Sequence, residues 1–138
     1  MKIRFVITLA IVLSAIGFGL SSNFQTAECR CATASFKNAY KQSKAVFVGE
    51  VVGEEKNGDT KTFNFKVEKY WKGANAKNIE IDVYETQRYQ AWFKKGEKYL
   101  IYADEYDGKL RVSRCSRSRE TANAKDDLQK LGKGKIPR

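Results

Sequence analysis

The feature that most constrains the fold is a strict alternation of apolar and polar side chains across Thr60–Trp71. Phe63, Phe65 and Val67 fall on one side of this alternation, and polar residues separate them. A repeat of two residues is typical of a β-strand with one buried face. Asn57-Gly58, just before the segment, is a strong signal for a tight hairpin turn. The segment is therefore predicted to be a strand that buries aromatic side chains.

Four more segments have the composition of strands. Gly49 lies inside the first of them, where a glycine predicts a bulge or a sharp bend. Asp107-Gly108 separates the last two and predicts a second hairpin turn. The four segments are Ala45–Val52, Asn78–Tyr84, Glu97–Glu105 and Leu110–Ser116.

Two helices are expected at the ends of this β-rich region. Thr33–Gln42 has apolar residues at helical spacing, and so does Arg119–Leu131, with Gly132 as its C-cap. Five strands and two helices predict a mainly β domain, a five-stranded OB-type Greek-key barrel with a short N-terminal and a C-terminal helix. A half-open sheet with both helices packed on it is the alternative. The expected core consists of Phe47, Phe63, Phe65, Val67, Ile79, Ile81 and Ile101.

The first residues have the three parts of a secretory signal peptide. Met1–Arg4 is positively charged, Phe5–Leu20 carries no charge, and Ser21–Ala27 is polar with small residues. We expect residues 1–27 to be removed on export, with cleavage between about 21 and 28. The chain would then be secreted, extracellular or periplasmic. A membrane anchor retained without cleavage is the alternative. The domain is expected over residues 28–132, followed by a frayed basic tail over 133–138.

The composition argues against an enzyme. The chain carries 26 Lys and Arg against 16 Asp and Glu, a formal charge of +10, and it has no His. Catalysis by His and zinc sites with His ligands are therefore excluded. The sequence also lacks a Gly-rich phosphate loop and any recognisable nucleophile motif. We expect no cofactor and no metal of its own.

Two clusters of charge have competing interpretations. Arg111, Arg114, Arg117 and Arg119 lie within nine residues, which predicts either a face that binds a polyanion or an ordinary solvated surface. The candidate polyanions are an acidic glycan or a membrane surface, because nucleic acid is a poor target outside the cell. The acidic pair Asp126-Asp127 is expected to lie on a helix surface.

The connection from Gln87 to Lys95 is polar and aromatic. Its aromatic residues Tyr89, Trp92 and Phe93 are expected either to form an exposed recognition loop or to close one end of the barrel.

Several short motifs occur in an order that points to a family. They are Cys29-Arg30-Cys31, the strand Val46-Phe47-Val48-Gly49-Glu50-Val51, the strand end Trp71-Lys72-Gly73, and Cys115-Ser116. Together they resemble the netrin-like domain of the tissue inhibitors of metalloproteinases, in particular its short bacterial-type members. The resemblance runs from Cys29 to about Gly132, and the family fold is an OB-type barrel.

The resemblance implies a function and a set of site residues. In the family, the mature N-terminal Cys binds the catalytic zinc of a protease through its α-amino nitrogen and its carbonyl oxygen. By this resemblance Cys29 would chelate the zinc and Arg30 would enter the primary pocket of the protease. Cys31 and Cys115 would form a supporting disulfide. The chain is thus expected to be a secreted inhibitor of a zinc metalloprotease; the alternative is an OB-type module that binds an acidic polymer through its basic face.

The sequence departs from the family pattern in two places: no good cleavage site directly precedes Cys29, and one cysteine of the pattern is missing. The family has a Cys in the connection before the fourth strand, whereas the corresponding stretch here, Tyr89–Phe93, has none. Cys29 therefore lacks its expected partner. Cys29 is a zinc chelator, a free reactive thiol, a link to another chain or a thiol left over after its partner was lost. Pairing of Cys29 with Cys115 is the alternative to the Cys31 bridge.

Overall fold

The computed structural model describes residues 31–138. The expected signal peptide, Cys29 and Arg30 lie outside the described residues. The described elements are α2 (Phe36–Gln42), β1 (Ala45–Asn57), β2 (Thr60–Lys72), β3 (Asn78–Tyr84), β4 (Lys98–Tyr106), β5 (Lys109–Arg111), β6 (Arg119–Glu120), the 3₁₀ helix η1 (Thr121–Asn123) and α3 (Lys125–Leu131).

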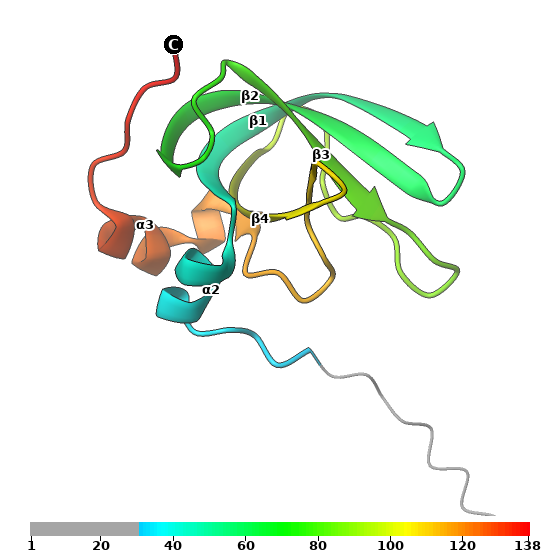
Figure 1. Cartoon of the computed structure of the whole chain (residues 1–138), viewed down its shortest axis with the longest axis horizontal. Helices are drawn as coiled ribbons and strands as arrows, with labels where there is room; N and C mark the ends of the chain where they lie inside the picture. Colours follow the sequence, from blue (N-terminus) through cyan, green and yellow to red (C-terminus); the bar gives the residue numbers. More distant parts are fainter. Residues whose placement is uncertain (1–30) are drawn as a thin grey trace, which may run out of the picture. The chain divides into compact units, whose positions relative to one another are not determined.

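The strands form one six-stranded sheet in the order β1-β2-β3-β5-β4-β6. β4 also pairs with β1, so that β1, β2, β3, β5 and β4 make a ring. All pairings are antiparallel except that of β3 with β5, which joins Asp82 to Arg111 in parallel. Figure 1 shows the long β1–β2 hairpin curving over the shorter strands. The predicted mainly β architecture is confirmed.

Both tight turns fall where the sequence predicts them, the first one residue later than expected. β1 and β2 are joined by Gly58 and Asp59, because Asn57 still pairs with Thr60. Asp107 and Gly108 join β4 to β5, and both have positive φ, 50° and 72°. A two-residue loop with two positive φ angles matches the right-handed twist of the flanking strands. The turns therefore set the register of both hairpins.

A bulge lies beside Gly49, where the sequence predicts one, but its extra residue is Glu68 on β2, because Val48 pairs with Lys69 and Gly49 with Val67. The register of β1 against β2 shifts between Val48 and Gly49. A Cβ on Gly49 would lie 3.0 Å from the carbonyl oxygen of Lys66, so a larger residue would push the two strands apart. A bulge bends the strand that carries the extra residue, so β2 is expected to bend at this point.

The main core lies within the ring of strands. The predicted core residues Phe47, Phe63, Phe65, Val67, Ile81 and Ile101 are all buried, and Ile79 is half-buried against them. Phe93 joins this core at 3% exposure and meets the rings of Phe63 and Phe65 edge-on at 5.2 and 5.4 Å. Trp92 packs beside it, half-buried. The connection that carries these two residues therefore serves the core and is not an exposed recognition loop at that point.

Both helices cover the outer side of β1 and β4. Val46, Val48 and Leu100 point to this side and pack with Ala39 of α2 and Leu128 of α3. Figure 1 shows the two helices next to each other on this side of the sheet. The ring core and the helix layer together bury both faces of β1, whose first seven residues are nearly all buried.

Several boundaries differ from the prediction. The first strand continues to Asn57 and does not end at Val52. The N-terminal helix begins at Phe36, because Ser35 caps it through a hydrogen bond from the Asn38 backbone N–H. The strand predicted over Leu110–Ser116 is shorter in the structure, because β5 ends at Arg111. The expected helix over 119–131 is reduced to α3, because Arg119 and Glu120 pair with β4 as β6.

The C-terminal tail is not frayed, which corrects the prediction for residues 133–138. The backbone of Lys135 exchanges two hydrogen bonds with Tyr70, of 2.9 and 2.8 Å. The indole N–H of Trp71 donates to the Gly132 carbonyl at 3.1 Å, and Gly134 lies against the same ring. The tail therefore runs as an extension along β2. Among residues 31–138, no helix combines the length and the apolar character needed to cross a lipid bilayer.

Candidate functional site

A disulfide holds the start of the described chain. Cys31 is bonded to Cys115, with 5.1 Å between their Cα atoms and 84 residues of sequence between them. This confirms the pairing that the family resemblance implies and excludes the alternative pairing of Cys29 with Cys115. Cys29 and Arg30 themselves lie outside the described residues, but they directly precede a residue that is covalently fixed to the domain.

A second attachment lies three residues further on. Arg117 donates from Nη1 to the Ala34 carbonyl at 3.0 Å. The same guanidinium donates from Nε and Nη2 to the two carboxylate oxygens of Asp127, at 2.6 and 2.7 Å. Arg117 thus ties the N-terminal segment to α3. The segment from Cys31 to Ala34 is held at both ends.

Asp127 is buried, which corrects the expectation that the Asp126-Asp127 pair lies on a surface. Only 1% of Asp127 is exposed, and it also accepts a hydrogen bond from the Tyr102 hydroxyl at 3.0 Å. Burial opposes its charged form, but the bonds from Arg117 and Tyr102 outweigh this and lower the pKa of Asp127. The bond to Asp127 raises the pKa of Arg117. The pair is therefore ionised at neutral pH.

Two serines complete this network. Ser118 Oγ accepts from the Tyr102 backbone N–H at 2.7 Å, and Ser116 Oγ donates to the Tyr102 carbonyl at 3.0 Å. The two hydroxyl oxygens are 2.8 Å apart. These bonds replace strand pairing where β5 has ended. They fix the stretch that carries Cys115 against β4.

The four arginines expected to form one basic face divide into two groups. Arg117 is half-buried in its pair with Asp127, and Arg119 Nη2 lies 3.8 Å from the same carboxylate. Arg111 and Arg114 are exposed and, within residues 31–138, form no ion pair. Each lies near a tyrosine ring instead: Arg111 over Tyr106 at 4.1 Å, and Arg114 over Tyr89 at 5.8 Å. Of the four arginines, Arg111 and Arg114 are the two that are exposed and lack an ion pair within the described residues.

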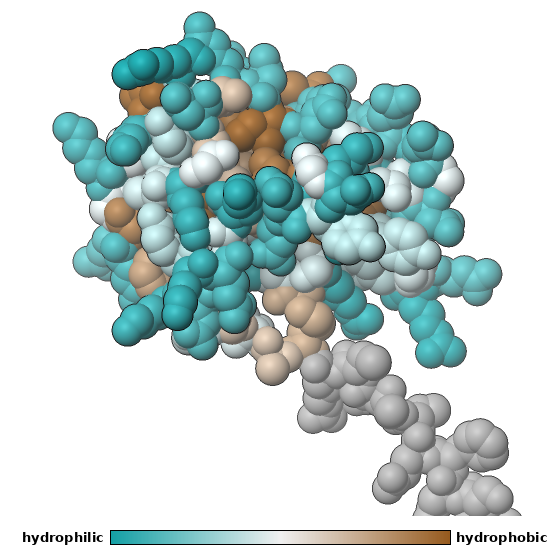
Figure 2. Space-filling view, viewed as in Figure 1, coloured by the Kyte–Doolittle hydropathy of each residue, from teal (hydrophilic) through white to brown (hydrophobic). Residues whose placement is uncertain are grey.

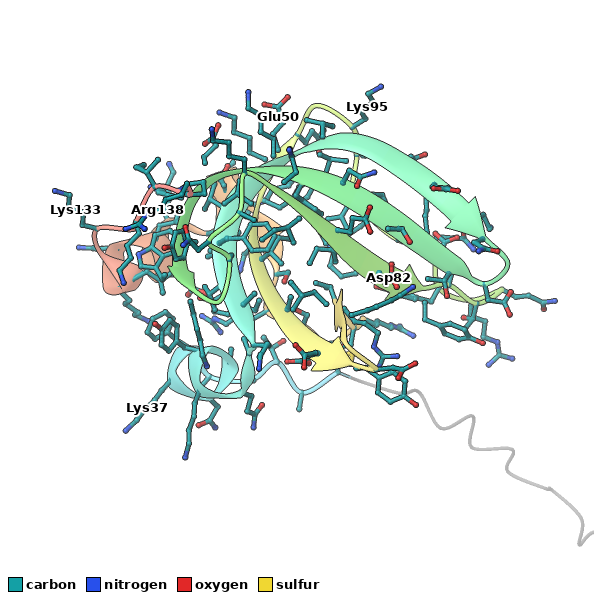
Figure 3. The ribbon with its side chains drawn as sticks, turned by 45° about the horizontal axis from the view of Figure 1, so that its top comes forward. Lys37, Glu50, Asp82, Lys95, Lys133 and Arg138 are labelled. Carbon is teal, nitrogen blue, oxygen red and sulfur yellow. A yellow bond between two sulfur atoms is a disulfide. The ribbon has the colours of Figure 1, made fainter. Side chains whose placement is uncertain are left out.

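Arg111 and Arg114 line a cleft of about 420 Å³ beside the parallel junction of β3 and β5. Its other lining residues are Asp82, Tyr84, Thr86, Tyr89, Asp104, Val112 and Ser113. Asp82 accepts from the Thr62 hydroxyl at 2.6 Å and lies 4.0 Å from Lys109. Asp104 makes no side-chain hydrogen bond or ion pair with any residue in the described range. Figure 3 shows Asp82 near the end of its strand, at the side of the ring away from the helices.

Tyr89 has an unusual environment in this cleft. Its hydroxyl is buried and has no hydrogen-bond partner among residues 31–138. Burial raises the pKa of Tyr89 to about 12, so the hydroxyl keeps its proton at neutral pH. An unpaired buried hydroxyl destabilises the folded protein, typically by about 1–3 kcal/mol.

Sequence patterns alone missed Asp127 and the cleft. One signal for Asp127 was present: it lies three residues after Ala124 and four before Leu131, on the apolar side of α3. No comparable signal marks the cleft, because Asp82, Tyr89, Asp104 and Arg114 come from four separate segments. Only the folded ring brings them together.

Comparison with known proteins leaves the family open: no family model matches the chain, and no curated protein matches it. Within residues 31–138, no group of three or more His, Cys, Asp or Glu side chains is placed to hold a metal ion.

Proposed function

We propose that the chain is a secreted, netrin-like module that inhibits a zinc metalloprotease through its N-terminal Cys29. The observation that carries the proposal is the double attachment of the segment after Cys29. Cys31 is bonded to Cys115, and Ala34 is bonded to Arg117. A chelating residue next to such an anchor loses less conformational freedom on binding than a free chain end would.

The strand order supports the OB-type Greek-key part of the proposal. The ring runs β1-β2-β3-β5-β4 and returns to β1, with β3 and β5 parallel. A five-stranded ring of mixed connection order is what an OB-type barrel requires. The ring is therefore consistent with the class that the resemblance implies.

The proposed mechanism depends on a free α-amine. After cleavage before Cys29, its amino nitrogen and carbonyl oxygen would form a five-membered chelate with the protease zinc and displace the bound water. Arg30 would then enter the adjoining pocket. Any residue left before Cys29 converts the amine into an amide, which does not bind zinc in this way.

The test compares two purified proteins against a panel of zinc metalloproteases. One begins at Cys29, and its matched control carries Ala27-Glu28 in front of Cys29. The proposal expects the first protein to inhibit and the second to be inactive. Equal inhibition by both would contradict zinc chelation, and inhibition by neither would contradict the inhibitor function.

A further inference from the structure

The cleft between β3 and β5 presents three kinds of group at once. Arg111 and Arg114 supply guanidinium groups that no carboxylate within residues 31–138 neutralises. Asp104 supplies a carboxylate without a described partner, and Tyr84 supplies an aromatic side chain that is 58% exposed. The volume of about 420 Å³ lies within the usual range for small-ligand sites, about 300–1,000 Å³.

The arrangement of Arg111 is informative. It lies directly opposite Asp104 in the β4–β5 register, where oppositely charged side chains normally pair. Its guanidinium packs over Tyr106 instead, at 4.1 Å. Stacking on a ring leaves the N–H edge of a guanidinium able to bind a planar acceptor. Both members of this cross-strand pair therefore keep their hydrogen-bonding capacity for a ligand.

We propose that this cleft binds an acidic saccharide, with Arg111 and Arg114 holding a uronate-type carboxylate and Asp104 accepting hydrogen bonds from sugar hydroxyl groups. The exposed Tyr84 ring provides apolar contact for the sugar ring.

Asp82 and Asp104 make the cleft more suitable for one class of anionic polymer than for another. A sulfated or phosphate-rich polymer offers acceptors and few donors, so Asp82 and Asp104 would repel it. A uronate polymer carries both carboxylates and hydroxyl groups. Its carboxylates can pair with the arginines of the cleft, and its hydroxyl groups can donate to the aspartates. The exposed lysines on the helix side, including Lys37 and Lys133 (Figure 3), lie outside the cleft.

The first experiment is a calorimetric titration of the secreted chain with an oligogalacturonate, at physiological salt. A neutral malto-oligosaccharide of the same length and a polyglutamate of matched charge serve as comparison ligands. The proposal expects the oligogalacturonate to bind at least about tenfold more tightly than either. No binding of the oligogalacturonate, or polyglutamate binding of equal strength, would overturn it.

The second experiment separates the cleft from the net charge. Arg111→Gln with Arg114→Gln should weaken oligogalacturonate binding about tenfold or more, because charged hydrogen bonds are lost. Lys37→Gln with Lys133→Gln removes the same charge outside the cleft and should change it less than about twofold. An equal loss of oligogalacturonate affinity in the two double variants would show that binding is general electrostatic attraction. That result would overturn the proposed site.

Asp104→Ala gives a signature that general attraction cannot produce. Loss of the acceptor should weaken oligogalacturonate binding, while loss of the negative charge should strengthen any binding of polyglutamate. A parallel increase for both ligands would contradict the role of Asp104. All the substituted side chains are exposed, and unchanged thermal unfolding would verify that each variant is folded. The inference is independent of protease inhibition, since no variant alters Cys29, Arg30 or Cys31.

Discussion

Arg117 and Asp127 form a two-point ion pair, in which Nε and Nη2 of the arginine donate to different oxygens of one carboxylate. The pair joins the stretch after Cys115 to α3, and the third donor of Arg117 reaches back to Ala34. One guanidinium therefore connects three segments, of which the one with Ala34 lies 83 residues before Arg117 in the sequence. The proposed inhibitory segment, which begins at Cys29, depends on this connection because the bond to Ala34 helps to hold the segment against the domain.

Removal of the Asp127 carboxylate should be costly. Asp127→Ala leaves the half-buried guanidinium of Arg117 without its counter-charge and is expected to lower the free energy of unfolding by about 3–5 kcal/mol. The matched control is Asp126→Ala, which removes an exposed carboxylate from the same helix turn and should cost at most about 1 kcal/mol. Urea unfolding at neutral pH measures both. Similar losses for the two variants would contradict the account of the pair.

The same carboxylate predicts a dependence of stability on pH. The pKa of Asp127 is lower in the folded protein than its ordinary value, so its contribution is complete above the unfolded pKa of about 4. The contribution is lost as the pH falls from there through the lower folded pKa. The stability difference between the wild type and Asp127→Ala should thus shrink in acid. A difference that grows between about pH 5 and pH 3 would contradict the direction of the shift.

Phe65 tests the predicted core. It is fully buried and meets the rings of Phe47, Phe93 and Tyr99. Phe65→Ala should lower the free energy of unfolding by about 3–5 kcal/mol. Val52→Ala, at a β1 position that is 40% exposed, should cost less than about 1 kcal/mol. Urea unfolding of both variants is the measurement, and a small loss at Phe65 would mean that the ring does not enclose it.

The disulfide should stabilise the domain by reducing the conformational entropy of the unfolded chain. Bonding Cys31 to Cys115 closes a loop across 84 residues of sequence, for which the chain-entropy relation gives at most about 4.5 kcal/mol. Replacing both residues by Ser should therefore lower stability by up to that amount. Peptide mapping without reduction gives the direct check. Alkylation of both cysteines before reduction would show that the bridge is absent.

Tyr89→Phe tests the unpartnered hydroxyl. Because the substitution removes a buried donor that has no described acceptor, stability should be unchanged or should rise. Tyr102→Phe is the contrasting change, since the hydroxyl of Tyr102 donates to Asp127, and its loss should cost about 1.5–3 kcal/mol. Thermal unfolding compares the two. A larger loss of stability in Tyr89→Phe than in Tyr102→Phe would contradict the account, because it would mean that the Tyr89 hydroxyl makes the stronger hydrogen bond.

The strands and their inward residues could be predicted because their information is local. A repeat of two residues in β2 specifies which side chains are buried, and Asp107-Gly108 specifies its turn without reference to the rest of the chain. The stretch from Val112 to Asn123 could not be predicted this way. Its conformation depends on Ser116 and Ser118 bonding to Tyr102 and on Arg117 bonding to Asp127.

The tail and the cleft were missed for the same physical reason. Residues 133–138 have the composition of a disordered end, yet Tyr70 and Trp71 hold them through contacts more than 60 residues away in sequence. Hydrophilic side chains predominate on the face of the molecule that Figure 2 shows. Such a surface gives no local sign of where a ligand binds. The cleft exists only because the ring brings β3 to β5.

The mass of the mature N-terminus tests the central claim most directly. Chelation of a protease zinc by Cys29 requires that export leave Cys29 as the first residue, with its α-amine free. Intact-mass and N-terminal peptide analysis of the secreted protein reads the cleavage position. The account predicts a chain that begins at Cys29. A mature chain that begins at Ser22, or at any other residue before Cys29, would contradict the proposed mechanism.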